Sequence, residues 1–196
     1  MAALAHLQPM VIAKSHADVV RCSIDEARLA LGFDIAAMRR NGFEPAIVEE
    51  HEAINGIIDS VLSNLVIREY LTTLTPCEVY GASGVRLLPL EDIRGEIARG
   101  AAPGGFIFPH GYLVFATSTG GNTICLHAQG GVVWADHHSF TNHLITYKDR
   151  ITGEWREVPF TPENIELATV KLSNDAPTFL ADLLNDRLET ELGSLD

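Results

Sequence analysis

Residues 104–138 have the sequence GGFIFPHGYLVFATSTGGNTICLHAQGGVVWADHH, which carries the strongest secondary-structure signal in the chain. Its apolar runs at residues 112–116, 123–126 and 132–135 are rich in Val, Ile, Phe, Tyr and Trp, residues that suit a pleated, half-buried strand. Gly-Gly-Asn and Gln-Gly-Gly turns separate the runs and supply the positive φ that tight hairpin turns require. The stretch therefore predicts a three-stranded antiparallel meander, which we expect to form the centre of a sheet.

Upstream of the meander, the pattern predicts a short hairpin followed by a short helix. Residues 78–81 and 85–88 flank Ala-Ser-Gly, which is typical of two strands around a tight turn. Pro89 suits the start of a helix, and Gly100 is a suitable residue to end it. The Ala-Ala-Pro-Gly-Gly segment at residues 101–105 then predicts a flexible crossing into the central sheet.

Downstream of the meander, the pattern predicts a second hairpin and two helical segments. Residues 144–147 and 154–160 flank a polar turn, so we expect a hairpin on the sheet's edge. Residues 161–164 resemble a helix start, and residues 166–170 are expected to form a short helix or an extended connector. Apolar residues recur at spacings of three and four over residues 175–188, which predicts a last amphipathic helix.

The N-terminal part of the chain predicts further helices. Ser23 and Glu26 form a capping-box pattern ahead of an apolar repeat, so we expect a helix over about residues 24–40. Because its apolar stripe must be buried, this helix is expected to pack back on the domain or to form a dimer contact. Helical spacing over residues 46–74 predicts one or two more helices.

Length and composition favour one main domain. The chain has 196 residues, of which 46% are hydrophobic, and this suffices for a single core of ordinary size. We therefore expect an N-terminal helical extension over residues 1–45 and one domain over residues 46–196. The predicted fold class is α+β, a twisted antiparallel sheet of about five to six strands covered by helices.

The central strands resemble those of a known superfamily. Tyr-Leu-Val-Phe-Ala at residues 112–116, the Gly-Gly-Asn turn, Ile-Cys-Leu and the Gly-Val-Val-Trp-Ala-Asp-His segment at residues 131–137 are similar to the core of the SUKH superfamily. That superfamily groups bacterial toxin-immunity proteins with fungal regulators of cell-wall synthesis. The likeness extends upstream to its lead-in strand and connecting helix and downstream to its closing helix at residues 172–184, so it covers roughly residues 55–190.

The resemblance implies a non-enzymatic, SUKH-like protein-binding domain. The motifs that carry it are strand and turn patterns without a catalytic group, so we expect no catalytic, cofactor-binding or metal-binding residues. It implies an immunity protein that neutralises a cognate bacterial toxin, for example a nuclease, by direct binding. An intracellular scaffold or regulatory module of the same superfamily is the related alternative.

The charge of the chain limits its direct partners. Its 26 acidic and 14 basic side chains give a formal net charge of −12. Nucleic acids and anionic membranes attract Lys-rich and Arg-rich surfaces, so neither is expected as a direct partner. The acidic excess suits a basic protein partner, and it also serves simply to keep a protein dispersed in water.

Cysteine and tryptophan residues are expected to have structural roles. Cys22, Cys77 and Cys125 are widely spaced and form no Cys-x-x-Cys pair, which is typical of a reducing compartment. Cys125 lies between Ile and Leu in a predicted strand, so we expect a small core residue rather than a nucleophile. Trp134 and Trp155 are expected to be core and sheet-face residues.

Targeting signals are lacking in the sequence. No apolar run reaches the length of a membrane span, and residues 1–20 do not have the layout of a signal peptide. We therefore expect a cytoplasmic protein.

The competing hypothesis is a metal-dependent enzyme with a histidine and aspartate cluster. Its candidate ligands are His110, His127, Asp136, His138 and His143. Neutral imidazole and carboxylate groups suit zinc or iron. If the strand continues past Asp136, successive side chains alternate between faces, and only Asp136 and His138 point together. In the SUKH resemblance Asp136 instead ends a strand and bonds the backbone of a turn, so we expect no metal site.

Overall fold

The computed structural model describes the chain in several segments. They are Arg40, residues 42–44, 46, 48, 64–98, 102–141, 143–185, 187 and 188. The helix predicted over residues 24–40 lies outside them except for Arg40, and so does most of the predicted helical segment before residue 64.

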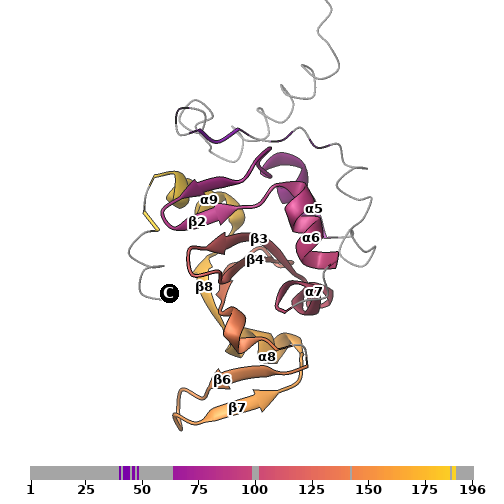
Figure 1. Cartoon of the computed structure of the whole chain (residues 1–196), viewed down its shortest axis with the longest axis vertical. Helices are drawn as coiled ribbons and strands as arrows, with labels where there is room; N and C mark the ends of the chain where they lie inside the picture. The colour runs from indigo at the N-terminus through magenta and orange to yellow at the C-terminus, as the bar shows by residue number, and fades with distance from the viewer. Residues whose placement is uncertain are drawn as a thin grey trace, which may run out of the picture.

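The described residues form eight strands and five α-helices, arranged as in Figure 1. The strands are β1 (Tyr80–Ala82), β2 (Val85–Leu87), β3 (Tyr112–Ser118), β4 (Thr123–His127), β5 (Val132–Ala135), β6 (Ile145–Lys148), β7 (Trp155–Val158) and β8 (Thr169–Ser173). The helices are α5 (Leu65–Thr73), α6 (Leu90–Ala98), α7 (Gly104–Ile107), α8 (Pro162–Leu167) and α9 (Ala176–Leu184). Two 3-10 helices, η1 (Phe108–His110) and η2 (His137–Ser139), flank the meander.

The main sheet has six antiparallel strands in the order β1-β2-β3-β4-β5-β8, and β6 and β7 form a separate two-stranded sheet. These sheets and helices confirm the predicted α+β fold. The predicted meander forms β3, β4 and β5, in which Tyr112 pairs with His127 and Thr123 pairs with Ala135. Gly121 in the turn between β3 and β4 has a φ of 84°, which glycine adopts without a steric cost.

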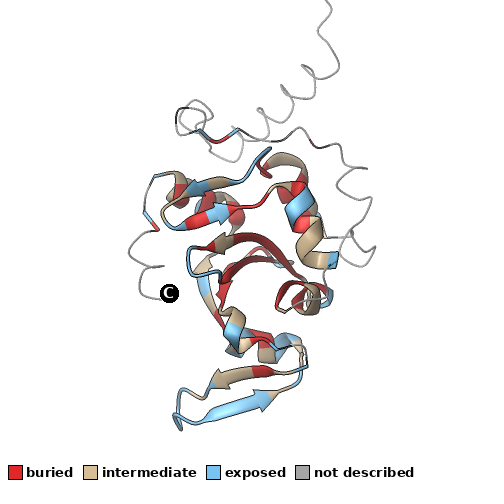
Figure 2. Ribbon diagram, in the orientation of Figure 1, coloured by how far each residue is buried: buried red, intermediate tan, exposed pale blue. Residues whose placement is uncertain are grey.

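One cluster of aromatic rings joins the main sheet to two helices. Phe115 of β3 contacts Tyr70 of α5, with ring centroids 4.9 Å apart, and Phe179 of α9, with centroids 5.6 Å apart. Both contacts are near edge-to-face, a favourable arrangement for aromatic rings. All three rings are buried, and Figure 2 shows buried residues concentrated in the central strands. This cluster makes Phe115 a central contact of the core.

Asn64 connects the start of α5 to the main sheet. Its Oδ1 accepts hydrogen bonds from the backbone N–H groups of Val66 (3.0 Å) and Ile67 (3.1 Å), and its Nδ2 donates to the carbonyl oxygen of Ala128 (2.6 Å). Asn64→Ala removes both the helix cap and this long-range hydrogen bond, so we expect the free energy of unfolding to fall by about 2 kcal/mol. Urea denaturation measures the change, and Thr72→Ala on the same helix is the control. Equal stabilities of the two variants would contradict the expectation.

The flexible crossing predicted over residues 101–105 is wrong for Gly104 and Gly105, because α7 begins at Gly104, while Ala101 lies outside the described residues. Gly104 is buried, and a Cβ atom at this position would lie only 2.9 Å from the carbonyl oxygen of Glu96 in α6. A side chain would therefore separate α7 from α6, which are in contact. The glycine permits close helix packing here rather than flexibility.

The segment between α8 and α9 also differs from the prediction. Residues 166–170 were expected to be a short helix or a connector, but α8 ends at Leu167 and Thr169 begins β8, the edge strand beside β5. The resemblance suggested a closing helix from residue 172, whereas α9 begins at Ala176. The edge strand was missed because its five residues are identified as a strand only by their pairing with β5.

Candidate functional site

The residues after β5 that the competing hypothesis offered as metal ligands build a turn. The chain forms η2 instead of continuing as a strand, so the condition under which Asp136 and His138 would point together is not met. Asp136 Oδ1 accepts a hydrogen bond from the backbone N–H of His138 at 2.9 Å, which confirms that Asp136 bonds the turn backbone. The backbone N–H of His137 donates to Asn122 Oδ1 at 3.1 Å, and His137 Nδ1 lies 2.8 Å from the same oxygen. Because that oxygen only accepts, Nδ1 carries the ring hydrogen.

The remaining predicted ligands lie in different elements. His110 belongs to η1, His127 ends β4, and His143 lies in the loop before β6. Thr123, at the other end of β4, pairs with the end of β5, so roughly 13 Å of strand separates His127 from the Asp136 turn. Within the described part of the chain, no three His, Cys, Asp or Glu side chains are grouped as metal ligands would be. The structure therefore does not bring the predicted ligands together.

The hairpin of β6 and β7 projects from the main sheet (Figure 1). Its prediction as an edge of the main sheet is wrong, because β6 and β7 pair with each other in a separate sheet, and β6 forms a further bridge between Ile145 and Phe140, which lies outside the strands of the main sheet. Ile145 pairs with Val158 and is fully buried. Lys148 pairs with Trp155 on the opposite side of this small sheet, because side chains alternate along a strand. Trp134 is buried as predicted, whereas Trp155 lies on a sheet face and is 69% exposed.

The side chain of Asp149 organises the turn between β6 and β7. Asp149 Oδ1 accepts hydrogen bonds from the backbone N–H groups of Ile151 (2.8 Å) and Thr152 (3.0 Å). Its Oδ2 lies 3.1 Å from Arg156 Nε in an ion pair. The hydrogen bonds from Thr152 and Ile151, with a smaller contribution from Arg156, hold the pKa of Asp149 below its usual value. These hydrogen bonds therefore stabilise the turn in a conformation in which the side chain of Ile151 is exposed to solvent.

Three exposed apolar side chains lie on this hairpin and on the adjacent α8. They are Ile151 (96% exposed), Trp155 (69%) and Leu167 (51%), and we name them the hairpin patch. Ile151 and Leu167 border a common cavity of about 260 Å³. The patch was missed from the sequence, although an isoleucine inside a polar turn is a signal that could have indicated it.

A larger cavity of about 570 Å³ adjoins the hairpin turn. We name it the Tyr112–His127 pocket, after two side chains that pair across β3 and β4 with ring centroids 4.5 Å apart. The other lining side chains used below are Val133 of β5, Lys171 of β8, Glu166 of α8 and Arg150 of the hairpin turn. Of these residues only His127 was a candidate from the sequence, because the others converge through strand pairing and the placement of the hairpin.

Burial determines the ionisation of the two rings in this pocket. Burial raises the pKa of Tyr112 to about 12, and the carboxylate of Glu166 adds to the rise. Burial lowers the pKa of His127, which Glu166 partly opposes. Both rings are therefore neutral at neutral pH. The backbone N–H of Gln129 donates to His127 Nδ1 at 3.4 Å, so the hydrogen of the neutral imidazole is on Nε2.

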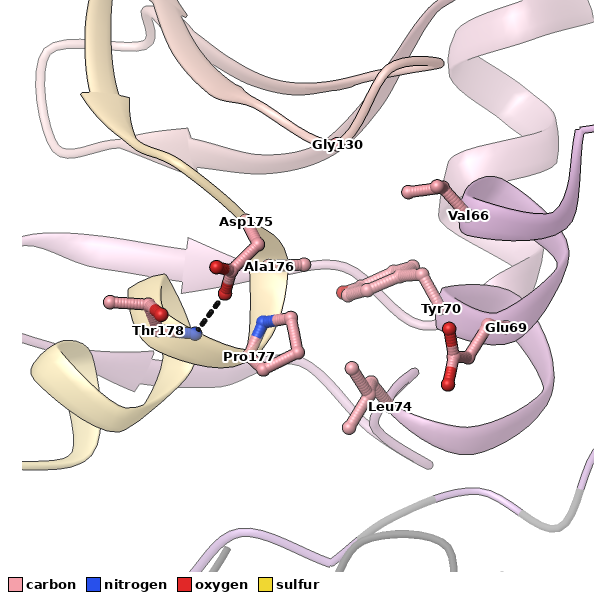
Figure 3. A pocket seen from close by; sticks show the side chains of 9 residues that line it. All are labelled: Val66, Glu69, Tyr70, Leu74, Gly130, Asp175, Ala176, Pro177 and Thr178. Atoms are coloured by element: carbon pink, nitrogen blue, oxygen red, sulfur yellow. Dashed lines mark hydrogen bonds between the residues drawn. The ribbon is translucent and has the colours of Figure 1, made fainter. Parts of the chain in front are cut away.

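A third cavity, of about 500 Å³, lies between α5 and the start of α9 (Figure 3). Tyr70, Leu74 and Pro177 contribute apolar surface to it. Asp175 accepts a hydrogen bond from the backbone N–H of Thr178 at 2.7 Å and so caps α9. The buried hydroxyl of Tyr70 has no hydrogen-bond partner among the described residues, and burial raises its pKa. A phenol held neutral in this way serves packing rather than acid–base chemistry.

The two described cysteines differ in burial. Cys125 is fully buried, as predicted, and burial raises the pKa of its thiol to about 12. The thiol is protonated at neutral pH and therefore unreactive. Cys77 is exposed, and Cys22 lies outside the described residues.

The fold and its cavities define an α+β protein with a projecting hairpin and a polar pocket beside it. Comparison of the chain with family models, with curated proteins and with solved structures finds no match. Among the residues that the structure describes, none of the helices has the length and apolar character needed to cross a membrane.

Proposed function

We propose that this protein is a SUKH-like protein-binding domain that neutralises a cognate toxin domain by covering the toxin's working surface. The hairpin patch is the observation that carries the proposal. Trp155 and Ile151 are largely exposed, and exposed aromatic and apolar anchors are typical of binding hot spots. Because Asp149 holds the turn by hydrogen bonds, little conformational entropy is lost when Ile151 enters a partner's pocket.

The charge of the chain supports a basic partner. A net charge of −12 accelerates association with a positively charged domain and disfavours nucleic acid and anionic membranes as competitors. A nuclease toxin would present such a basic surface, since it must bind nucleic acid. The proposed place of action is the cytoplasm, where a toxin would have its target. If the protein is instead a regulatory module of the same superfamily, it would bind a different partner through the same hairpin patch.

The alternative of a metal-dependent enzyme has less support. Its proposed centre around Asp136 consists of side chains that already bond the turn, with Asp136 on the backbone of His138 and His137 on Asn122. No observation in the described residues favours a metal at this place.

Co-purification of the full chain from its native host tests the proposal. We expect a stoichiometric complex with one basic domain, and we expect that this domain stops growth of a heterologous host unless the present protein is made with it. Recovery of the protein alone with stoichiometric zinc or iron, which is lost in His138→Ala, would overturn the proposal in favour of the enzyme. A stoichiometric partner without toxicity would favour the regulatory module.

A further inference from the structure

We propose that the Tyr112–His127 pocket binds a small organic anion, namely a carboxylate or phosphate monoester carried on an apolar or aromatic body. The pocket adjoins the hairpin patch, since Arg150 precedes Ile151 in the hairpin turn and Glu166 precedes Leu167 in α8. The inference does not depend on the proposed binding of a toxin. It rests on the charge, the hydrogen-bonding groups and the size of the pocket.

The charge of the pocket is opposite to that of the whole chain. Arg150 and Lys171 are two exposed cations, and Glu166 is the one anionic side chain that lines the pocket within the described residues. The local balance is therefore one positive charge, in a chain whose net charge is −12. Neither Arg150 nor Lys171 forms an ion pair within the described part of the chain. Both cations are thus available to an anionic ligand.

Several side chains of the pocket can donate hydrogen bonds to a ligand. Arg150 and Lys171 only donate, and the neutral ring of His127 carries its hydrogen on Nε2. The hydroxyl of Tyr112 makes no hydrogen bond to another described residue. A ligand rich in acceptors, such as a carboxylate or a phosphate, matches this set of donors.

The size and the walls of the pocket indicate that the ligand is larger than an inorganic ion. A volume of about 570 Å³ lies within the range usual for small-molecule sites, about 300 to 1,000 Å³. Val133 and the contacting rings of Tyr112 and His127 provide surface on which an apolar or aromatic body can pack. Convergence of a few polar groups on such a surface is typical of a binding site.

Histidine-ring NMR spectra of the full chain provide the test, with benzoate, phenyl phosphate and inorganic phosphate as separate probes. We expect saturable shifts of the His127 signals with benzoate or phenyl phosphate, and weaker binding of inorganic phosphate. Lys171→Ala and Arg150→Ala are each expected to weaken binding at least about tenfold, because each removes a charged donor. Arg86→Ala is the matched control, since Arg86 is an exposed arginine on β2.

The pKa of His127 gives an independent readout. A bound anion favours the protonated imidazole, so the pKa of His127 should rise in the complex, and binding should strengthen as the pH falls. Within the described residues, the other titratable or charged side chains that line the pocket are Tyr112, Glu166, Arg150 and Lys171. Glu166→Gln should lower the pKa of His127 in the free protein without preventing the rise on binding, because Glu166 favours the charged ring.

Three outcomes would overturn the inference. The first is the absence of saturable shifts with all three probes. The second is equal binding of inorganic phosphate and phenyl phosphate, which would exclude a role for the organic body. The third is an equal loss of binding in Arg86→Ala and Arg150→Ala, which would indicate a non-specific charge effect. None of these results depends on whether a protein partner is recovered, so the two proposals fail separately.

Discussion

Phe115→Ala is expected to lower the free energy of unfolding by about 3 to 5 kcal/mol, the range measured when a buried phenylalanine is truncated. Phe115 is fully buried, and its ring contacts both Tyr70 of α5 and Phe179 of α9. Truncation leaves a cavity at the point where the two helices meet the sheet. Because a domain is commonly stable by about 5 to 15 kcal/mol, this one change should remove a large fraction of the stability.

Urea denaturation followed by circular dichroism measures this loss. Phe106→Ala is the matched control, because Phe106 is only partly buried and stacks on Phe160, with ring centroids 5.4 Å apart, away from the Phe115 cluster. We expect the control to lose less than half as much stability as Phe115→Ala. Similar losses in the two variants would contradict the central role assigned to Phe115.

Trp155→Ala is expected to weaken the proposed protein complex by about 2 to 4 kcal/mol, or roughly 30-fold to 700-fold in Kd. Trp155 is 69% exposed, so its truncation should alter the stability of the free protein by less than about 0.5 kcal/mol. Ile151→Ala should have a smaller effect of about 1 kcal/mol, because less apolar area is removed. Isothermal titration with the purified partner measures both changes.

Leu65 offers a matched control for the hairpin patch. Its side chain is 73% exposed and lies on α5 rather than on the hairpin. Leu65→Ala should bind the partner with unchanged affinity. Loss of binding in Leu65→Ala, with normal binding in Trp155→Ala, would place the interface on α5 and refute the role proposed for the hairpin.

The central meander could be predicted because its signals are local. Short apolar runs and the glycine turns between them define β3, β4 and β5 without reference to the rest of the chain. The start of α8 was predicted from Pro162, and Thr161 caps this helix by accepting a hydrogen bond from the backbone N–H of Asn164. Asp136 was also expected to bond its own turn, which it does.

The errors concern segments whose conformation depends on distant partners. β8 is a strand because it pairs with β5, and Gly104 is helical because α7 packs closely on Glu96 of α6. The turn after Asp136 also depends on a distant residue, because the hydrogen bonds of His137 with Asn122 hold η2. None of these interactions is visible within a short window of sequence.

Local sequence was sufficient for the α+β class and for the order of the central strands, because turn chemistry and side-chain periodicity act over a few residues. It was not sufficient for the surfaces on which the two proposals rest. Arg150 and Lys171 line one pocket only because β8 pairs with β5 and the hairpin turn lies near this edge of the main sheet, and Trp155 is exposed on a hairpin that is separate from the main sheet. Long-range strand pairing and packing decide where these side chains lie, because the exposure of a side chain depends on which surfaces other elements of the fold cover.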